Sequence, residues 1–300
     1  MTADLSLLEK YRPSSLPAPL PEKYVNFLGL QTQADFFGNG ASIVGRVFPS
    51  LPAGDDGVYG GYPEYQSVLL AINNRARKDT FVAAELGAGW GPWISAAGVV
   101  CKNEGVSDIT LIGVEADHGK CGFMHEHLEN NGLLSGTYGA SKVQSTIIEG
   151  AAWSEDTVLY FGGGDSRGDH GGAASKDGGS VDYRGATVPK VKVNAFSLET
   201  ICKPVNGLID YMHWDIQGAE RNAAASGINF LNERVAYLFI GTHSRAVEGS
   251  LLELFFLHQW DLVIQNPCHF TYDRLKPSLE GMTTTDGELL LRNPRLASSN

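Results

Sequence analysis

The sequence predicts an α/β protein whose mostly parallel, doubly wound sheet of seven strands carries helices on both faces. Apolar segments of strand length alternate with segments of helical periodicity from residue 64 onward. The apolar segments are nearly continuous, as in strands that are buried on both faces. A glycine-rich loop joins the first strand to the next helix, where such Rossmann-like sheets hold their ligands.

The expected helices each have a periodicity or end signal. Val68, Leu69 and Ile72 share one helical face, and the next helix has Pro92 in its first turn and Gly105 at its end. We expect helices at 64–77, 92–105, 118–132, 219–225 and 251–260. The strands are apolar runs such as TFVAAEL, ITLIGVEA and VAYLFIGT. We expect strands at 80–86, 109–116, 143–151, 207–215, 235–242, 261–267 and 287–294.

Two regions depart from this alternation. Residues 1–63 are rich in proline and glycine, and we expect an irregular N-terminal extension that wraps the core of a domain formed by residues 64–300. Within that domain, residues 161–190 form a glycine-rich insertion, and its stretch 161–185 holds nine glycines. This composition favours a disordered surface insertion. Its position after the third strand leaves a lid over bound ligand as the alternative.

The overall composition excludes several classes of protein. The net charge of −11 and the lack of a basic patch argue against nucleic acid or anionic lipid as a partner. No apolar run has the length of a transmembrane segment, and the first residues lack a secretion signal. Four scattered cysteines without a CxxC pair indicate a cytoplasmic protein. The oligomeric state is not determined by the sequence.

The loop ELGAGWGPW, at 85–93, is the strongest local signal for a ligand. Gly87, Gly89 and Gly91 allow a tight turn and close approach of a ligand to the main chain. The spacing differs from the dinucleotide pattern G-x-G-x-x-G. The carboxylate of Glu85 suits an ammonium group better than a pyrophosphate, which favours S-adenosylmethionine over NAD. We expect the cofactor to contact Glu85, Gly87, Ala88, Gly89 and Trp90.

The next two strand ends supply further candidates for binding the cofactor. Glu115 ends the second strand, where a carboxylate can accept hydrogen bonds from both ribose hydroxyls, and Ala116 follows it. Alternatively, Glu115 and Asp117 cap the following helix. The third strand ends in small residues with accessible backbone groups that can receive an adenine ring, namely Gly150, Ala151 and Ala152.

The segment IDYMHWDIQGAE, at 209–220, combined with the glycine loop, resembles class I S-adenosylmethionine-dependent methyltransferases of the FkbM type. The resemblance covers roughly residues 80–267. It implies transfer of a methyl group to a hydroxyl of a small molecule or glycan. The chain departs from the family at His213, where a lysine is usual, and at Gly241-Thr242-His243, where Glu-x-His is usual. By its place in this motif His213 is a candidate for binding the acceptor.

Asp215 and His243 follow neighbouring strands and are the expected catalytic residues. Neighbouring strands lie about 4.8 Å apart, so both side chains can reach one acceptor oxygen. His243 has the ordinary pKa of a base that works near neutrality. Asp215 then orients it, contacts the cofactor and the acceptor hydroxyl, or shares a divalent metal such as Mg or Mn with it. The alternatives are a helix cap for Asp215 and a loop histidine for His243.

Two roles are possible for Arg245, and two for a group of three tyrosines. Arg245 either binds an anionic group of the acceptor or is a solvated residue at a helix start. Tyr59, Tyr62 and Tyr65 either line an acceptor cleft or pack the N-terminal extension. Two other functions also remain: an oxidoreductase with an NAD-type nucleotide cofactor, and a non-catalytic module that binds a cofactor.

Overall fold

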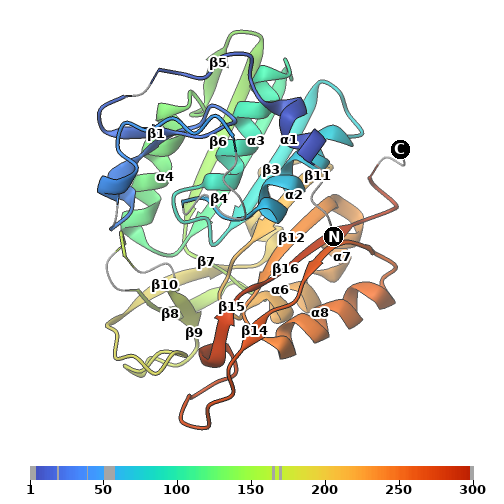
Figure 1. The fold of residues 1–300 in the computed structure, drawn as a ribbon. Coiled ribbons are helices and arrows are strands. Elements are labelled where there is room, and N and C mark those ends of the chain that lie inside the picture. Colours follow the sequence, from blue (N-terminus) through green and yellow to red (C-terminus); the bar gives the residue numbers. More distant parts are fainter. Residues whose placement is uncertain are drawn as a thin grey trace.

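The computed structural model describes residues 5–18, 20–38, 40–50, 58–163, 166–168 and 171–297. A twisted sheet of eight strands crosses the molecule, with helices on both of its faces (Figure 1). Its strands lie in the order β13-β16-β12-β11-β3-β4-β6-β5. Their bounds are β3 Thr80–Leu86, β4 Asp108–Glu115, β5 Gly136–Tyr138, β6 Ser141–Glu149, β11 Ile209–Trp214, β12 Val235–Thr242, β13 Asp261–Asn266 and β16 Gly287–Arg292.

The centre of this sheet is parallel and its edges are antiparallel. β6, β4, β3, β11 and β12 run in parallel, whereas β16 is antiparallel to both β12 and β13. The short strand β5 pairs antiparallel with β6 at the opposite edge. The sequence predicts seven strands and misses β5, since three residues are too few to show an alternating pattern.

Alternate residues of the central strands enter two separate cores, as the geometry of a strand requires. Tyr211 and Phe239 join the core that includes residues of α2 (Tyr62–Asn73), α3 (Pro92–Asn103) and α4 (His118–Asn130). Met212 and Leu238 join the core on the other face. That second core includes residues of α5 (Leu198–Ile201), α6 (Glu220–Ser226), α7 (Ile228–Arg234) and α8 (Arg245–Leu257).

The chain reverses its direction of travel across the sheet between β3 and β11. From β3 it proceeds outward through β4 to β6, and it then returns to β11 and proceeds through β12 toward the other edge. The carboxyl ends of β3 and β11 therefore flank the crevice in which ligands of open α/β sheets bind.

The N-terminal segment is more regular than the sequence predicts. It forms α1 (Leu5–Tyr11), the pair β1 (Lys23–Val25) and β2 (Gln31–Gln33), and the 3-10 turns η1 (Ala34–Phe36) and η2 (Gly40–Ser42). Tyr24, Phe36 and Tyr59 belong to the same core as α2, α3 and α4. The aromatic side chains thus pack this segment onto the domain, although its strands are too short to be predicted. The division of the chain at residue 63 stays a prediction.

A second sheet lies below the main sheet in Figure 1. Its strands β7 (Ala151–Ala152), β8 (Thr157–Gly162), β9 (Ala173–Ser175) and β10 (Lys190–Phe196) are ordered β7-β10-β8-β9. The glycine-rich insertion therefore contributes β9, while its residues 164–165 and 169–170 lie outside the described part of the chain. A hairpin follows with β14 (His269–Phe270), the turn η3 (Glu280–Met282) and β15 (Thr283–Thr285). None of the described helices is long and apolar enough to span a bilayer.

Candidate active site

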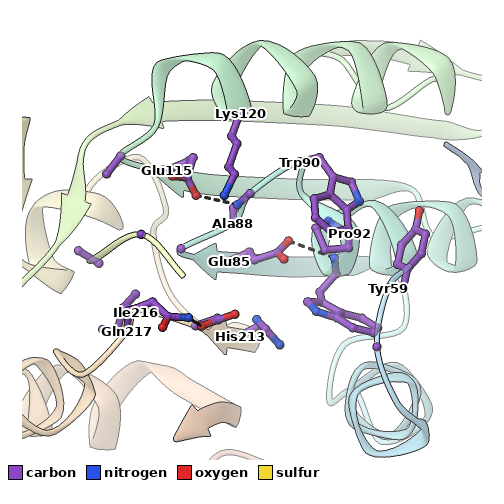
Figure 2. A pocket seen from close by; sticks show the side chains of 18 of the residues that line it. Tyr59, Glu85, Ala88, Trp90, Pro92, Glu115, Lys120, His213, Ile216 and Gln217 are labelled. Carbon is purple, nitrogen blue, oxygen red and sulfur yellow. Dashed lines mark hydrogen bonds between the residues drawn. The ribbon is translucent and has the colours of Figure 1, made fainter. Parts of the chain in front are cut away.

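A cavity of about 750 Å³ opens at the carboxyl ends of β3, β4 and β11, and Figure 2 shows it from close by. Besides Tyr59, twelve of the residues that the sequence singles out for the cofactor, the acceptor or catalysis line this cavity. They are Glu85, Gly87, Ala88, Gly89, Trp90, Glu115, Ala116, Gly150, Ala151, Ala152, His213 and Asp215. His243 lies next to it and lines a second cavity of about 330 Å³, which shares Gln217 and Asp286 with the first.

The glycine loop is shaped by its contact with the segment that follows β11. A Cβ atom on Gly87 would lie 1.8 Å from the carbonyl oxygen of Asp215, and the backbone φ of Gly87 is +71°. Only glycine fits here, because both the space and the left-handed conformation exclude a side chain. Gly89 also has a positive φ, +54°, but no atom lies within 4 Å of its missing Cβ.

Glu85 caps the start of α3. Its Oε2 atom accepts hydrogen bonds from the N–H groups of Trp93, at 3.1 Å, and Ile94, at 2.9 Å. Pro92 has no N–H, and the N–H of Ser95 binds the carbonyl of Gly91. The first turn of α3 therefore has no free N–H for a pyrophosphate.

The environment of Glu85 also affects its charge. The side chain is buried, and burial raises its pKa well above the ordinary carboxyl value, although the two N–H donors oppose this shift. A cation in the cavity would stabilise the ionised form of Glu85.

Glu115 links the glycine loop to the start of α4. Its Oε2 accepts from the N–H of Gly89 and its Oε1 from the N–H of Asp117, both at 2.7 Å. Asp117, in turn, accepts from the N–H of Lys120, so the predicted cap of this helix by Asp117 is confirmed. Burial raises the pKa of Glu115, against the opposing effect of its N–H donors and of Lys120, which reaches toward it from α4 (Figure 2).

Asp215, His243 and Glu220 form a row of three charged side chains behind the cavity. Nε2 of His243 lies 3.0 Å from Oδ1 of Asp215, and its Nδ1 lies 2.7 Å from Oε1 of Glu220. Burial alone lowers the pKa of His243, but the charge of Glu220 and the hydrogen bonds to both carboxylates raise it well above its ordinary value. The pKa of Asp215 is lowered by His243, against the effect of burial.

This geometry brings the predicted pair together and changes the role of its histidine. Both ring nitrogens of His243 face carboxylates, so neither is free to take a proton from an acceptor. Asp215 is 45% exposed and lines the cavity, whereas the His243 side chain is 5% exposed. The carboxylate is therefore the group of this pair that faces a ligand. The buried Glu220, which the sequence analysis did not single out, is the third member.

His213 is a buried imidazole at the cavity wall. Its ring stacks on Phe239 at 5.0 Å between centroids and lies 5.5 Å from the ring of Trp93. Burial lowers its pKa to about 3, so the ring is neutral. Within the described part of the chain neither ring nitrogen has a hydrogen-bond partner, and Oε1 of Glu64 lies 3.9 Å from Nε2.

No protein-family model matches the chain. A protein of Jannaschia sp. (strain CCS1) described as "Putative methyltransferase" is 29% identical over 291 residues, which cover 92% of this chain and 94% of that protein. Among solved structures, methyltransferase FkbM from Methylobacillus flagellatus KT has 11% identity and a TM-score of 0.42, over 76% of this chain and 58% of that one. A precorrin-6y C5,15-methyltransferase from Geobacter metallireducens GS-15 has 10% identity and a TM-score of 0.38, over 78% and 87%.

The parallel sheet with helices on both faces is a Rossmann-like fold. The similarity to the Jannaschia protein supports a methyltransferase enzyme, and a methyltransferase implies S-adenosylmethionine as the cofactor. The cavity lies at the reversal point of the strand order, where a methyltransferase of this architecture holds its ligand.

Segments on both sides of the methyltransferase sheet complete the cavity. Phe37 and Tyr59 come from the N-terminal segment, and Phe161 and Arg167 come from the glycine-rich insertion. The carbonyl of Arg167 accepts from the N–H of Gly38, which joins the two segments. Their glycine-rich and proline-rich composition carries no periodic signal, so sequence analysis could single out only Tyr59. Tyr59 both lines the cavity and belongs to the core.

Two further predictions concern the position of Arg245 and the presence of a metal site. Arg245 begins α8, where its side chain is 53% exposed and lies 3.7 Å from Glu248, and it lines neither cavity. The described residues also contain no group of three or more His, Cys, Asp or Glu side chains that could hold a metal ion. Asp215 and His243 thus remain a pair in direct contact.

Proposed function

We propose that the protein is an S-adenosylmethionine-dependent O-methyltransferase of the FkbM type that methylates a hydroxyl of a small molecule or glycan. One observation supports this most directly. A single cavity is lined by the glycine loop and Glu115, the candidates for the cofactor, and by Asp215 and His213, the candidates for the acceptor. Its volume, about 750 Å³, lies within the range of pockets that hold ligands of this size.

The residues of the cavity fit the cofactor. Each Glu115 oxygen accepts one backbone hydrogen bond and keeps acceptor capacity for a ribose hydroxyl. Gly150, Ala151 and Ala152 leave space beside the end of β6 for a planar ring. The carboxylates of Glu85 and Asp215 suit the cationic part of the molecule. The N–H groups at the start of α3 are already bound, which disfavours the pyrophosphate of an NAD-type cofactor.

When bound, S-adenosylmethionine supplies an electrophilic methyl group on its sulfonium. Asp215 accepts a hydrogen bond from the acceptor hydroxyl and holds its oxygen in position. On transfer of this methyl group, the Asp215 carboxylate would take the proton that the acceptor hydroxyl loses. His243 is a positioning residue: its Nε2–H holds Oδ1 of Asp215, and Glu220 keeps the ring charged and oriented.

Gln217 assists the same carboxylate. Its amide nitrogen donates to Oδ1 of Asp215 at 2.8 Å, and its amide oxygen accepts from the hydroxyl of Tyr183 at 3.0 Å. Because Gln217 adopts a φ of +48°, the backbone of this loop is held in a conformation that few non-glycine residues adopt. The amide of Gln217 and the imidazole of His243 each donate to Asp215 and thus fix the orientation of its carboxylate.

The test separates cofactor binding from methyl transfer. Calorimetry should show S-adenosylhomocysteine binding to the wild-type protein, with no comparable binding of NAD. Labelled S-adenosylmethionine is then screened against sugars, nucleotide sugars and lipid-linked glycans. We expect Asp215→Asn to lower methyl transfer by about 100-fold or more, in line with the loss of a proton-accepting group. NAD binding without binding of the homocysteine compound, or unchanged turnover in Asp215→Asn, would overturn the proposal.

A further inference from the structure

The cavity wall beside His213 is strongly acidic. Glu64, Asp215 and Asp286 line it, and among the described residues the lining cations are Lys120 of α4 and Arg167 of the glycine-rich insertion. Glu288 adds a fourth carboxylate nearby. It lies opposite Gly241 in the β12–β16 pair, two residues before Leu290, which lies opposite Phe239. Because alternate residues share a face of the sheet, Glu288 lies on the cavity side.

These carboxylates extend beyond the reach of the cofactor. The ribose candidate Glu115 ends β4, whereas Glu288 lies on β16, four strands away in the sheet order. At about 4.8 Å per strand, this separation amounts to roughly 19 Å. The cationic groups of S-adenosylmethionine at the ends of β3 and β11 therefore lie away from the carboxylate of Glu288.

The mutual repulsion of these carboxylates helps to raise the pKa values of Asp286 and Glu288. Burial raises the pKa of Asp286, and the negative charges of Asp215 and Glu220 raise it further, although His243 opposes them. Burial likewise raises the pKa of Glu288, and the charge of Glu64 adds to the effect. A positive charge placed among these carboxylates would relieve both the repulsion and part of the cost of burial.

His213 is a buried polar side chain in the wall of the cavity. Its side chain is 4% exposed, and its two ring nitrogens have no hydrogen-bond partner among the described residues. A buried, unsatisfied imidazole costs free energy, so a ligand that binds it gains affinity. The 3.9 Å between its Nε2 and Oε1 of Glu64 allows one ligand nitrogen to donate to both atoms at normal hydrogen-bond length.

The walls around this point are aromatic. Trp93 flanks His213, and Tyr59 lies 6.0 Å from Trp93 and 6.5 Å from Trp90 between ring centroids. The ring centroid of Phe37 lies 4.8 Å from that of Trp90. All four rings line the cavity. Aromatic faces combined with carboxylates are the surroundings that attract an organic cation.

We propose that the acceptor carries an ammonium group, which is held by Glu64 and His213 among the aromatic walls, in addition to the hydroxyl that Asp215 orients. This inference rests on the proposed function and narrows its acceptor to amine-bearing compounds. Acceptors with a phosphate or carboxylate in this position are rejected, because the acidic cavity wall repels them. An isolated metal ion fits less well, since no three ligand groups converge among the described residues.

The experiment uses three probes of nearly equal shape. The protein is first saturated with S-adenosylhomocysteine, and calorimetry then measures the binding of benzylammonium, benzyl alcohol and benzoate. We expect benzylammonium to bind at least about tenfold more tightly than benzyl alcohol, and benzoate not to bind measurably, as expected for a cation–π and carboxylate site. Equal affinity for the three probes, or no binding of benzylammonium, overturns the inference.

Matched variants locate the effect. Glu64→Gln keeps an oxygen that can accept from the N–H of Gly61, as Oε2 does now, but removes the charge. His213→Phe keeps the aromatic stacking and removes the ring nitrogens. Each is expected to weaken benzylammonium binding about tenfold, whereas the exposed Glu155→Gln has no effect. Unchanged binding in both cavity variants also overturns the inference. Failure of S-adenosylhomocysteine to bind in the first step instead refutes the proposed function itself.

Discussion

The Oε1 atom of Glu220 lies 2.7 Å from Nδ1 of His243, and both side chains are buried. This contact joins the first turn of α6 to the loop after β12, where Nε2 of the same ring holds Asp215. A charged imidazole between two carboxylates compensates much of their cost of burial, and removing one partner leaves the others uncompensated. The row thus couples the stability of the domain to the position of its proposed catalytic carboxylate.

Replacement of Glu220 tests this coupling. Glu220→Gln keeps the size of the side chain but removes the charge opposite His243, so we expect the free energy of unfolding to fall by about 1–3 kcal/mol. Urea denaturation measures the change. Glu233→Gln, at an exposed position of α7, is the control and is expected to change stability by less than about 0.5 kcal/mol. Equal effects of the two substitutions would contradict a buried ion pair.

The dependence of stability on pH gives an independent test of His243. Its pKa in the folded protein is raised well above the ordinary value of about 6.5 that it regains on unfolding. The folded protein therefore holds this proton more tightly, and the resulting stabilisation is complete below pH of about 6.5 and lost as the pH rises through the folded pKa. We expect His243→Asn to lose this part of the alkaline decline. Parallel curves of unfolding free energy against pH for the two proteins would count against it.

Two glycines of the same loop should respond differently to alanine. Gly87→Ala places a Cβ against the carbonyl of Asp215, so we expect severe destabilisation or failure to fold. Gly89→Ala has open space, and we expect it to fold at a cost of about 1–2 kcal/mol for its left-handed backbone. Its methyl group then points toward the cavity and should weaken S-adenosylhomocysteine binding. Thermal unfolding and calorimetry measure both effects, and equal stability of the two variants would contradict the contact at Gly87.

Glu85 has two roles that substitution can separate. Glu85→Ala removes the cap of α3 and is expected to cost about 0.5–2 kcal/mol of stability. Glu85→Gln keeps an acceptor oxygen for the N–H groups of Trp93 and Ile94 and removes only the charge. We expect this variant to remain close to wild-type stability while binding S-adenosylhomocysteine about tenfold more weakly, because an ammonium group loses its partner. Glu129→Gln, at an exposed position of α4, is the control. Unchanged affinity in Glu85→Gln would assign Glu85 to the cap alone.

The sequence by itself determined the alternation of strands and helices, and with it the position of the glycine loop and of Asp215. Strands β3 and β12 have the predicted bounds, since buried apolar runs and helix-end residues are local signals. Along β11, the alternation of a strand places His213 against Phe239 on one face and Trp214 in the second core on the other, and Asp215 follows directly.

Only the tertiary structure decided how these residues are charged and what surrounds them. The partner of His243, Glu220, is 23 residues away in the chain, and Glu85 binds N–H groups eight and nine residues beyond it. Phe37 and Tyr59 reach the cavity from a segment without periodic pattern, and Glu64 reaches it from the first turn of α2. Burial and long-range contacts set the pKa values of these groups, and neither can be calculated from local sequence, because both depend on which distant segments exclude water from the site.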